Sequence, residues 1–220
     1  MLADRTIHVN FINIKFLLPI FLPLLSCKLF LPFPANRVYT IPMTTYISML
    51  RGINVSGQKK IRMVDLKNMF ETLGFGNIQT YVQSGNVVFD SHEQGVVTLQ
   101  KSIETQIETT FRFSVPVLIR TLDDFKRIIE SHPFKNEEAI RVLVTFLYER
   151  PEQSKLEDLS HYKDKVDKFA IGELEIFLFC PGGYGKTKLS NTFFERKLDV
   201  VATTRNWKSV NALYEMTSER

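Results

Sequence analysis

From residue 43 onward, the apolar positions of this 220-residue chain follow two periods that predict its strands and helices. Alternation over two residues between turn-forming residues predicts strands, and apolar residues three and four positions apart predict helices. The predicted strands cover residues 46–50, 78–82, 87–89, 115–120, 140–148, 166–171 and 173–179. The predicted helices cover residues 63–73, 97–111, 121–132, 155–162, 189–198 and 207–216.

The order of these elements predicts an α+β fold made of two packed ferredoxin-like halves with antiparallel sheets. Residues 43–135 are predicted as β-α-β-β-α-β, the ferredoxin-like arrangement with two helices on one face of the sheet. Residues 136–220 are predicted as β-α-β-β-α followed by a C-terminal helix, which is a modified second half. No long polar linker separates the halves, so we expect them to pack together.

Residues 1–42 form an apolar N-terminal extension that differs from the rest of the chain. Its run from Phe16 to Cys27 is too short to span a bilayer and contains prolines. It can be a secretory leader, a membrane-associated tail, or upstream sequence read from a start codon placed too early. We favour the third interpretation because the composition changes abruptly at Met43, and we expect the extension to be poorly ordered. The body is then cytoplasmic without stable membrane association; a genuine leader would make it exported or membrane-tethered.

Local charge is more informative than the net charge of +4. Much of that excess lies in residues 1–42, so the body is close to neutral and its overall charge does not indicate nucleic-acid binding. Two basic clusters nevertheless stand out, and they indicate either solvated surface or a focused anion site. Their members are Arg51, Lys59, Lys60 and Arg62 in the first, and Lys186, Lys188, Arg196, Lys197, Arg205 and Lys208 in the second.

Cysteine and histidine usage excludes several classes of site. The two cysteines, Cys27 and Cys180, lie far apart, which excludes a disulfide scaffold and a cysteine-built zinc site. The four histidines lack metal-ligand spacing, so we predict neither a metal nor a cofactor. Cys180 follows an apolar strand and is expected to be unreactive.

Two loops of the first half carry candidate ligand-binding residues. The loop after the first strand has glycines, an asparagine and cations, a composition that suits phosphate, and its candidates are Arg51, Gly52, Asn54 and Gly57. The turn between the next two strands adds Gln83, Ser84 and Asn86, which can equally be simple turn residues.

Two loops of the second half carry the remaining candidates. The turn Gly182–Gly185 ends in Gly-Lys-Thr, but Cys180 stands where a P-loop needs its first glycine, so an NTPase site is not expected. The turn with Lys188 still suits an anion. Before the last helix, Thr204 is a candidate cap, with Arg205, Asn206 and Trp207 beside it.

These four loops resemble a known family. The segments Leu50–Gly57, Thr80–Phe89, Thr187–Leu189 and Ala202–Trp207 are similar to the bacterial family called domain of unknown function 1697. The resemblance implies a soluble bacterial cytosolic protein with a tandem ferredoxin-like fold that begins at Met43, and it implies no established activity. The chain departs from the family pattern at Ser56, usually glycine, and at Thr187, usually serine.

These observations favour a binding protein for a phosphorylated ligand, a nucleotide or short nucleic acid, in a basic site between the halves. In that hypothesis Arg51, Lys188 and Arg205 neutralise phosphate, and Asn54, Gln83 and Asn86 read polar groups. An enzyme using general acid–base chemistry is one alternative, although the candidate loops hold no histidine or acid. A protein–protein interaction module is another. The sequence leaves the catalytic residues, the ligand and the oligomeric state open.

Overall fold

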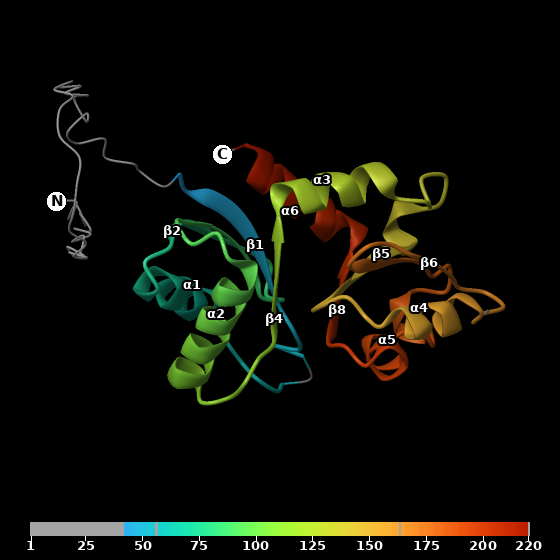
Figure 1. Cartoon of the computed structure of the whole chain (residues 1–220), viewed down its shortest axis with the longest axis horizontal. Coiled ribbons are helices and arrows are strands. Elements are labelled where there is room, and N and C mark those ends of the chain that lie inside the picture. The colour runs from blue at the N-terminus through green and yellow to red at the C-terminus, as the bar shows by residue number, and fades with distance from the viewer. Residues whose placement is uncertain (1–41, 56, 163, 220) are drawn as a thin grey trace, which may run out of the picture. The chain divides into compact units, whose positions relative to one another are not determined.

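The first half of the described chain is built around a four-stranded antiparallel sheet. The computed structural model describes residues 42–55, 57–162 and 164–219. The strand order is β2-β3-β1-β4, with β3 and β1 inside the sheet and β2 and β4 at its edges. Figure 1 labels β1 and the two edge strands. The strands are β1 (Thr44–Leu50), β2 (Gly76–Tyr81), β3 (Asn86–Ser91) and β4 (Val117–Thr121).

Two helices cover one face of this sheet. Helix α1 (Met63–Thr72) and helix α2 (Val96–Phe111) turn their apolar faces toward Tyr46, Leu50 and Phe89 of the sheet and form one core with them. Helix α1 ends where the sequence predicts, because Gly74 follows it at φ +79°, a left-handed conformation that glycine adopts without strain.

The second half repeats the same strand order as β6-β7-β5-β8, again fully antiparallel. Its strands are β5 (Val142–Leu147), β6 (Lys168–Ile171), β7 (Glu175–Phe179) and β8 (Ala202–Asn206). Helix α4 (Gln153–Ser160) and helix α5 (Asn191–Leu198) cover one face. Short 3₁₀ turns occur at Ala139–Arg141 and Tyr184–Lys186.

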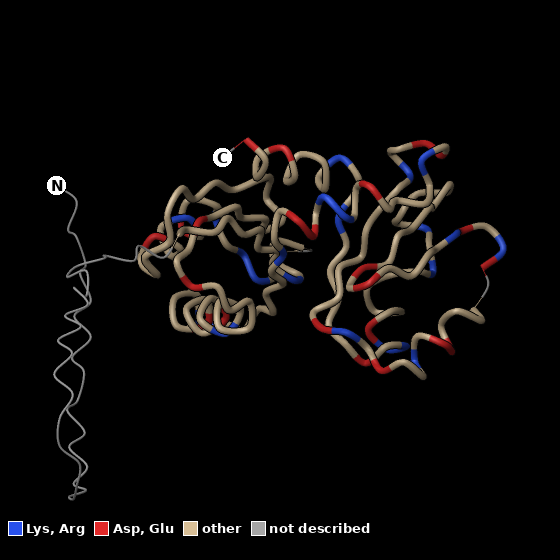
Figure 2. Tube along the Cα trace, turned by 45° about the horizontal axis from the view of Figure 1, so that its top comes forward, with Lys and Arg blue, Asp and Glu red and all other residues tan. Residues whose placement is uncertain are grey.

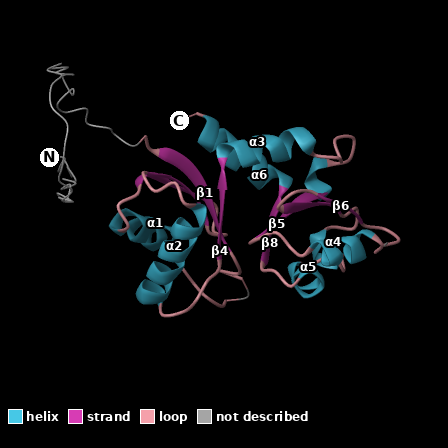
Figure 3. Ribbon diagram, viewed as in Figure 1, coloured by secondary structure: helices cyan, strands magenta, loops and turns pink. Residues whose placement is uncertain are grey.

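A third helix follows the last strand of each sheet. Helix α3 (Leu122–Ser131) follows β4, and helix α6 (Trp207–Ser218) follows β8. These helices cover the remaining faces of both sheets (Figure 3) and share one core with them, which includes Ile47, Phe125, Phe146 and Val210. The described residues therefore form an α+β structure with two four-stranded antiparallel sheets and six α-helices.

Strand β8 corrects the prediction for the second half. The sequence predicts no strand between α5 and α6, but Ala202–Asn206 pairs along the edge of β5, with Arg205 opposite Val144. The proposed cap at Thr204 is also wrong, because Thr204 lies inside β8 and Asn206 caps α6 by accepting a hydrogen bond from the Ser209 N–H. Mostly polar residues hide this strand from a hydrophobicity pattern.

The start of α3 confirms a predicted cap. The Thr121 side chain accepts a hydrogen bond from the Asp124 N–H, and the Asp124 carboxylate accepts one from the Thr121 N–H. Such a reciprocal capping box satisfies two amide groups that the first helical turn leaves free. Thr121 and Asp124 thus fix the point at which β4 ends and α3 begins.

The N-terminal extension, membrane spans and metal sites can be addressed only for the described residues. The predicted extension over residues 1–42 lies, apart from Pro42, outside the described residues. Within the described ranges, none of the helices combines the length and the hydropathy needed to cross a bilayer. The same ranges contain no group of three or more His, Cys, Asp or Glu side chains placed to hold a metal ion.

Candidate functional site

The connection between β1 and α1 is a long loop that Asn54 holds together. Several of its residues adopt positive φ angles, namely Gly52, Asn54, Gly57 and Lys59. Asn54 Nδ2 donates hydrogen bonds to the carbonyls of Ile61 (2.9 Å) and Gln83 (2.8 Å), and its Oδ1 accepts from the Ile61 N–H (2.9 Å). Asn54 thereby closes its own loop and joins it to the β2–β3 turn.

A cavity of about 560 Å³ opens beside this loop. Its volume lies in the usual range for small-molecule sites. Three of the sequence-predicted site residues, Asn54, Gly57 and Gln83, lie in its wall. The other lining residues come from the end of the loop, the first turn of α1 and the last residue of α2, and they are Lys60, Ile61, Arg62, Asp65 and Phe111.

The cavity wall carries a positive charge that protein groups do not fully balance. Arg62 is paired with Asp65 through two hydrogen bonds of 2.7 and 2.8 Å. Lys60 is exposed and has neither a hydrogen bond nor an ion pair to any described residue. Arg62 also occupies the N-cap position of α1 without a side-chain cap, so the first amide groups of α1 add a positive end to this wall.

This positive character is local. Figure 2 shows Lys and Arg interspersed with Asp and Glu along the trace of both halves, without a long run of one sign. The glycine-rich turn of the second half is less suited to an anion than the sequence suggests. Ser190 caps α5 through the Phe193 N–H, and the Tyr184 hydroxyl accepts from the Asn191 N–H. Amide groups at that helix start are therefore already occupied.

Arg205 lies in the interior between the halves. It is 7% exposed, and all five of its N–H groups donate to protein acceptors. These acceptors are Asn86 Oδ1, Thr203 Oγ1 and the carbonyls of Leu50, Ser84 and Thr204. None is a carboxylate, and desolvation lowers the pKa of Arg205 to about 10. Arg205 therefore remains a buried cation at neutral pH, and its donors are used to join the halves.

Asn86 and Ser84 belong to the same interior network. Asn86 is fully buried, and its Nδ2 donates to the Tyr81 carbonyl (3.1 Å) and to Ser84 Oγ (2.9 Å). Its Oδ1 faces the Arg205 guanidinium. The β2–β3 turn is therefore held in shape by residues that also contact the second half.

Arg51 links the long loop to helix α5. Its Nε and Nη2 donate to the two carboxylate oxygens of Glu195, both at 2.9 Å. Hydrogen bonding to Glu195 raises the pKa of Arg51. Burial pushes the pKa of Glu195 upward, but hydrogen bonds from Arg51 and from the Ala202 N–H outweigh it, and the net pKa is lowered. Arg205 bonds to the carbonyl of Leu50, the neighbour of Arg51, so the structure brings these two predicted arginines to the same junction.

The remaining predicted residues, Gly52, Lys188, Asn206 and Trp207, do not line the cavity beside Asn54. Gly52 follows Arg51 at φ +70°. Lys188 is exposed; the pKa of Asp164 is lowered mainly by backbone N–H groups and also by the charge of Lys188. Trp207 packs against His132 with ring centroids 4.2 Å apart.

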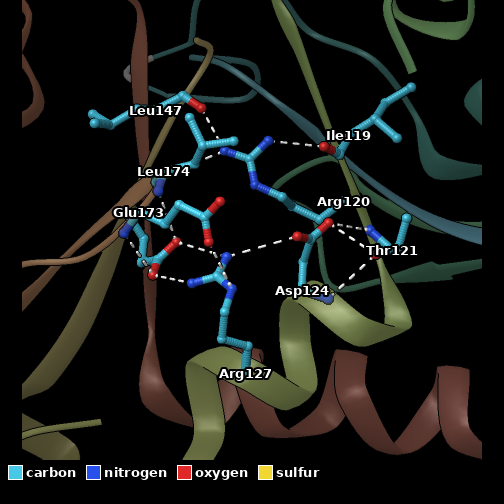
Figure 4. A network of polar contacts seen from close by, with 9 residues as sticks. Ile119, Arg120, Thr121, Asp124, Arg127, Leu147, Glu173 and Leu174 are labelled. Atoms are coloured by element: carbon cyan, nitrogen blue, oxygen red, sulfur yellow. Dashed lines mark hydrogen bonds and ion pairs between the residues drawn. The ribbon is translucent and has the colours of Figure 1, made fainter. Parts of the chain in front are cut away.

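A second arginine network joins the halves at β4, and its residues are not among the predicted site residues. Arg120 is 3% exposed and donates to the carbonyls of Ile119, Leu147 and Leu174 (Figure 4). Arg127 bridges Asp124, Glu173 and the buried Glu175. Arg120 is the last residue but one of β4, as Arg205 is of β8, so recognising the repeat with β8 included is the signal that would have revealed it.

The groups with shifted pKa values do not assemble into a catalytic centre in the described chain. Cys180 is fully buried, and desolvation raises its pKa to about 11, so it stays a thiol at neutral pH. Burial, and then the charge of Lys135, lower the pKa of His132. His132 packs among Trp207, Phe177 and Phe134 rather than facing the cavity.

Comparison with known proteins gives a family and similar solved structures. Residues 43–177 match the family model described as Protein of unknown function (DUF1697), and the chain belongs to that family. The structure is similar to that of a conserved bacterial protein from Streptococcus pneumoniae, with a TM-score of 0.67 and 26% sequence identity. The similarity covers 80% of this chain and 99% of that one. No curated protein matches the chain.

Proposed function

We propose that this member of the DUF1697 family binds a phosphorylated ligand, a nucleotide or a short nucleic acid, in the cavity beside Asn54. The observation that carries the proposal is the meeting of Lys60, Arg62 and the start of α1 in one wall of a ligand-sized cavity. Unoccupied amide groups at a helix start and cationic side chains together stabilise phosphate.

The geometry divides the sequence-predicted residues between two roles in this proposal. Asn54, Gly57 and Gln83 border the ligand, because they line the cavity. The junction residues shape the loops behind it, and these are Arg51, Gly52, Ser84, Asn86 and Arg205. Lys188, Asn206 and Trp207 have no part in the proposed site.

Two of the broader expectations also remain proposals. Each half repeats the element order and strand order of a ferredoxin-like unit, which supports assigning residues 43–135 and 136–220 to two such units. The 26% identical relative is a bacterial protein, which supports a bacterial source for this chain. The cytoplasmic location of residues 43–220 stays a proposal of its own. Cell fractionation of the natively expressed chain tests the location.

The test is a titration of the whole chain with AMP and ribose 5-phosphate, followed by calorimetry. Replacing both cations (Lys60→Ala with Arg62→Ala) should weaken binding of either probe by at least about tenfold, because charge-assisted hydrogen bonds to phosphate are lost. A charge-matched control (Lys101→Ala with Arg196→Ala) removes two exposed cations outside the cavity and should leave affinity unchanged.

The sign of a second substitution gives a sharper test. Asp65 lines the cavity, so Asp65→Asn removes a negative charge from its wall and should tighten the binding of both probes. Weaker binding in Asp65→Asn would contradict an anionic ligand. The proposal fails if neither probe binds the wild type, or if the double variant binds as tightly as its charge-matched control.

A further inference from the structure

We infer that the cavity beside Asn54 takes a single nucleoside phosphate, whose base stacks on Phe111. This inference rests on the proposed function and adds the class of ligand to it. Phe111 is the aromatic residue among those that line the cavity, and it lines the same cavity as the cations Lys60 and Arg62. A phosphate held near Lys60 therefore places the rest of the ligand within reach of an aromatic ring.

Phe111 is built as a supported surface. It is the last residue of α2, it is half-buried, and it packs against the core of the first half. Its ring also stacks with that of Phe113, with centroids 6.3 Å apart and planes 26° apart. A ring that is supported by the core and by a second aromatic ring, and that still lines a cavity, offers a preorganised face for a flat group.

The chain turn after Phe111 keeps both rings in place. Arg112 ends α2 in the left-handed conformation at φ 66°, and its N–H donates to the Glu108 carbonyl. Lys59, which precedes Lys60 in the basic loop, donates to the Ser114 carbonyl (2.7 Å) and ties that loop to this segment. The loop that carries Lys60 and the segment that follows Phe111 are therefore held together by a direct hydrogen bond.

Polar groups of the cavity suit the edges of a base or a sugar. The Gln83 side chain is exposed and makes no hydrogen bond to the described residues, so its amide can both donate and accept. Asn54 differs, because its side chain is used to close the loop. Gln83 is accordingly the side chain that would contact the ligand.

The size and charge of the cavity favour one nucleotide over a longer nucleic acid. About 560 Å³ suits a small molecule. The cations at the cavity are confined to the residues 59–62, and Arg62 is already shared with Asp65. A nucleic acid strand needs a continued row of cations to follow its backbone, whereas one phosphate group needs only this cluster.

The experiment compares ligands that differ only in the base. AMP should bind the wild type at least about tenfold more tightly than ribose 5-phosphate, because a stacked base adds a favourable aromatic contact. Phe111→Leu should remove that preference and leave ribose 5-phosphate binding unchanged. Phe111→Tyr should keep the preference. Phe113→Leu is the matched control, since Phe113 packs on the same core without lining the cavity, and it should retain most of the preference.

The outcomes separate this inference from the one it rests on. Equal binding of AMP and ribose 5-phosphate, with both weakened in Lys60→Ala/Arg62→Ala, overturns the base-stacking site and leaves phosphate binding standing. Failure of both probes to bind overturns both. A five-residue oligoadenylate that binds more than tenfold tighter than AMP, with affinity falling steeply as salt rises, overturns the single-nucleotide assignment. Circular dichroism of each variant confirms that it is folded.

Discussion

The two halves share a strand order, but the connection that follows their first strand differs in length and charge. In the first half this connection spans residues 51–62, and in the second half it spans only residues 148–152. The longer one contains the closed loop around Asn54 and borders the cavity of about 560 Å³. The shorter one passes directly from β5 into α4.

The charges at the two helix starts differ as well. Neither α1 nor α4 has a side-chain cap, so no N-cap side chain accepts from the first amide groups of either helix. The charged residues that directly precede α1, Lys59, Lys60 and Arg62, are all cationic. Those before α4 are Glu149, Arg150 and Glu152, with a net negative charge. The same scaffold thus favours an anion at one helix start and disfavours it at the other. Binding character lies in the loop and not in the repeated fold.

The junction arginines offer a second comparison, with the largest expected effect on stability. Arg205→Met should lower the free energy of unfolding by about 3–5 kcal/mol, because it strands several buried acceptors. Arg120→Met should cost less, about 1–3 kcal/mol, since Arg120 makes fewer hydrogen bonds and its buried Nε has no partner in the described chain. Urea denaturation measures both values, and a larger loss in Arg120→Met would refute the distinction.

The loop of the first half can be weakened without touching the second. Asn54→Ala should destabilise the protein by about 2–4 kcal/mol, because it removes three hydrogen bonds and places alanine at φ 56°. Asn54→Gly loses the same hydrogen bonds but tolerates the angle, so it should be less destabilised than Asn54→Ala. Equal stability of the wild type and both variants would show that the loop is not held by Asn54.

The ion pair between this loop and α5 should give a moderate, pH-dependent effect. Glu195→Gln should cost about 1–2 kcal/mol at pH 7, because the two hydrogen bonds from Arg51 lose their ionic partner. The lowered pKa of Glu195 means that this stabilisation is present above its ordinary value of 4.5 and disappears as the pH falls through the lowered value. Denaturation at several pH values should therefore show the variant converging on the wild type in acid. A difference in unfolding free energy that stays constant with pH would contradict a stabilising ion pair between Arg51 and Glu195.

The smallest effect is expected at the contact of α3 with α6. His132 has a lowered pKa, so the neutral form is favoured in the fold, and stability is lost as the pH falls from 6.5 through the lowered value. The loss should be under about 1 kcal/mol and should be absent in His132→Gln. Trp207 is the single tryptophan of the chain, and the centroids of its ring and the His132 ring are 4.2 Å apart. Its fluorescence therefore reports the titration of His132. A wild-type fluorescence signal that stays constant as the pH falls from 7 until the protein unfolds would contradict it.

Local patterns were sufficient wherever a segment buries its own apolar face. Leu99, Ile103 and Ile107 lie on one side of α2 at helical spacing, and all three are buried as that spacing predicts. The Thr121–Asp124 capping box and Gly74 mark helix ends through contacts with residues only a few positions away. The four polar loops could also be recognised, because turn residues and cations stand out in the sequence.

The partners of those polar residues depend on chain segments far apart in sequence. Arg205 was expected to face a phosphate, yet three of its five acceptors lie in the other half, on Asn86, Ser84 and Leu50. The remaining two, on Thr203 and Thr204, use its last donors. Glu195 and Phe111 are not among the predicted site residues, because nothing near them in the chain shows what they face. Sequence periodicity reports which side of an element is buried, since burial recurs with the backbone repeat. Which polar group meets which is decided by packing between distant segments, and that information exists only once the two halves have come together.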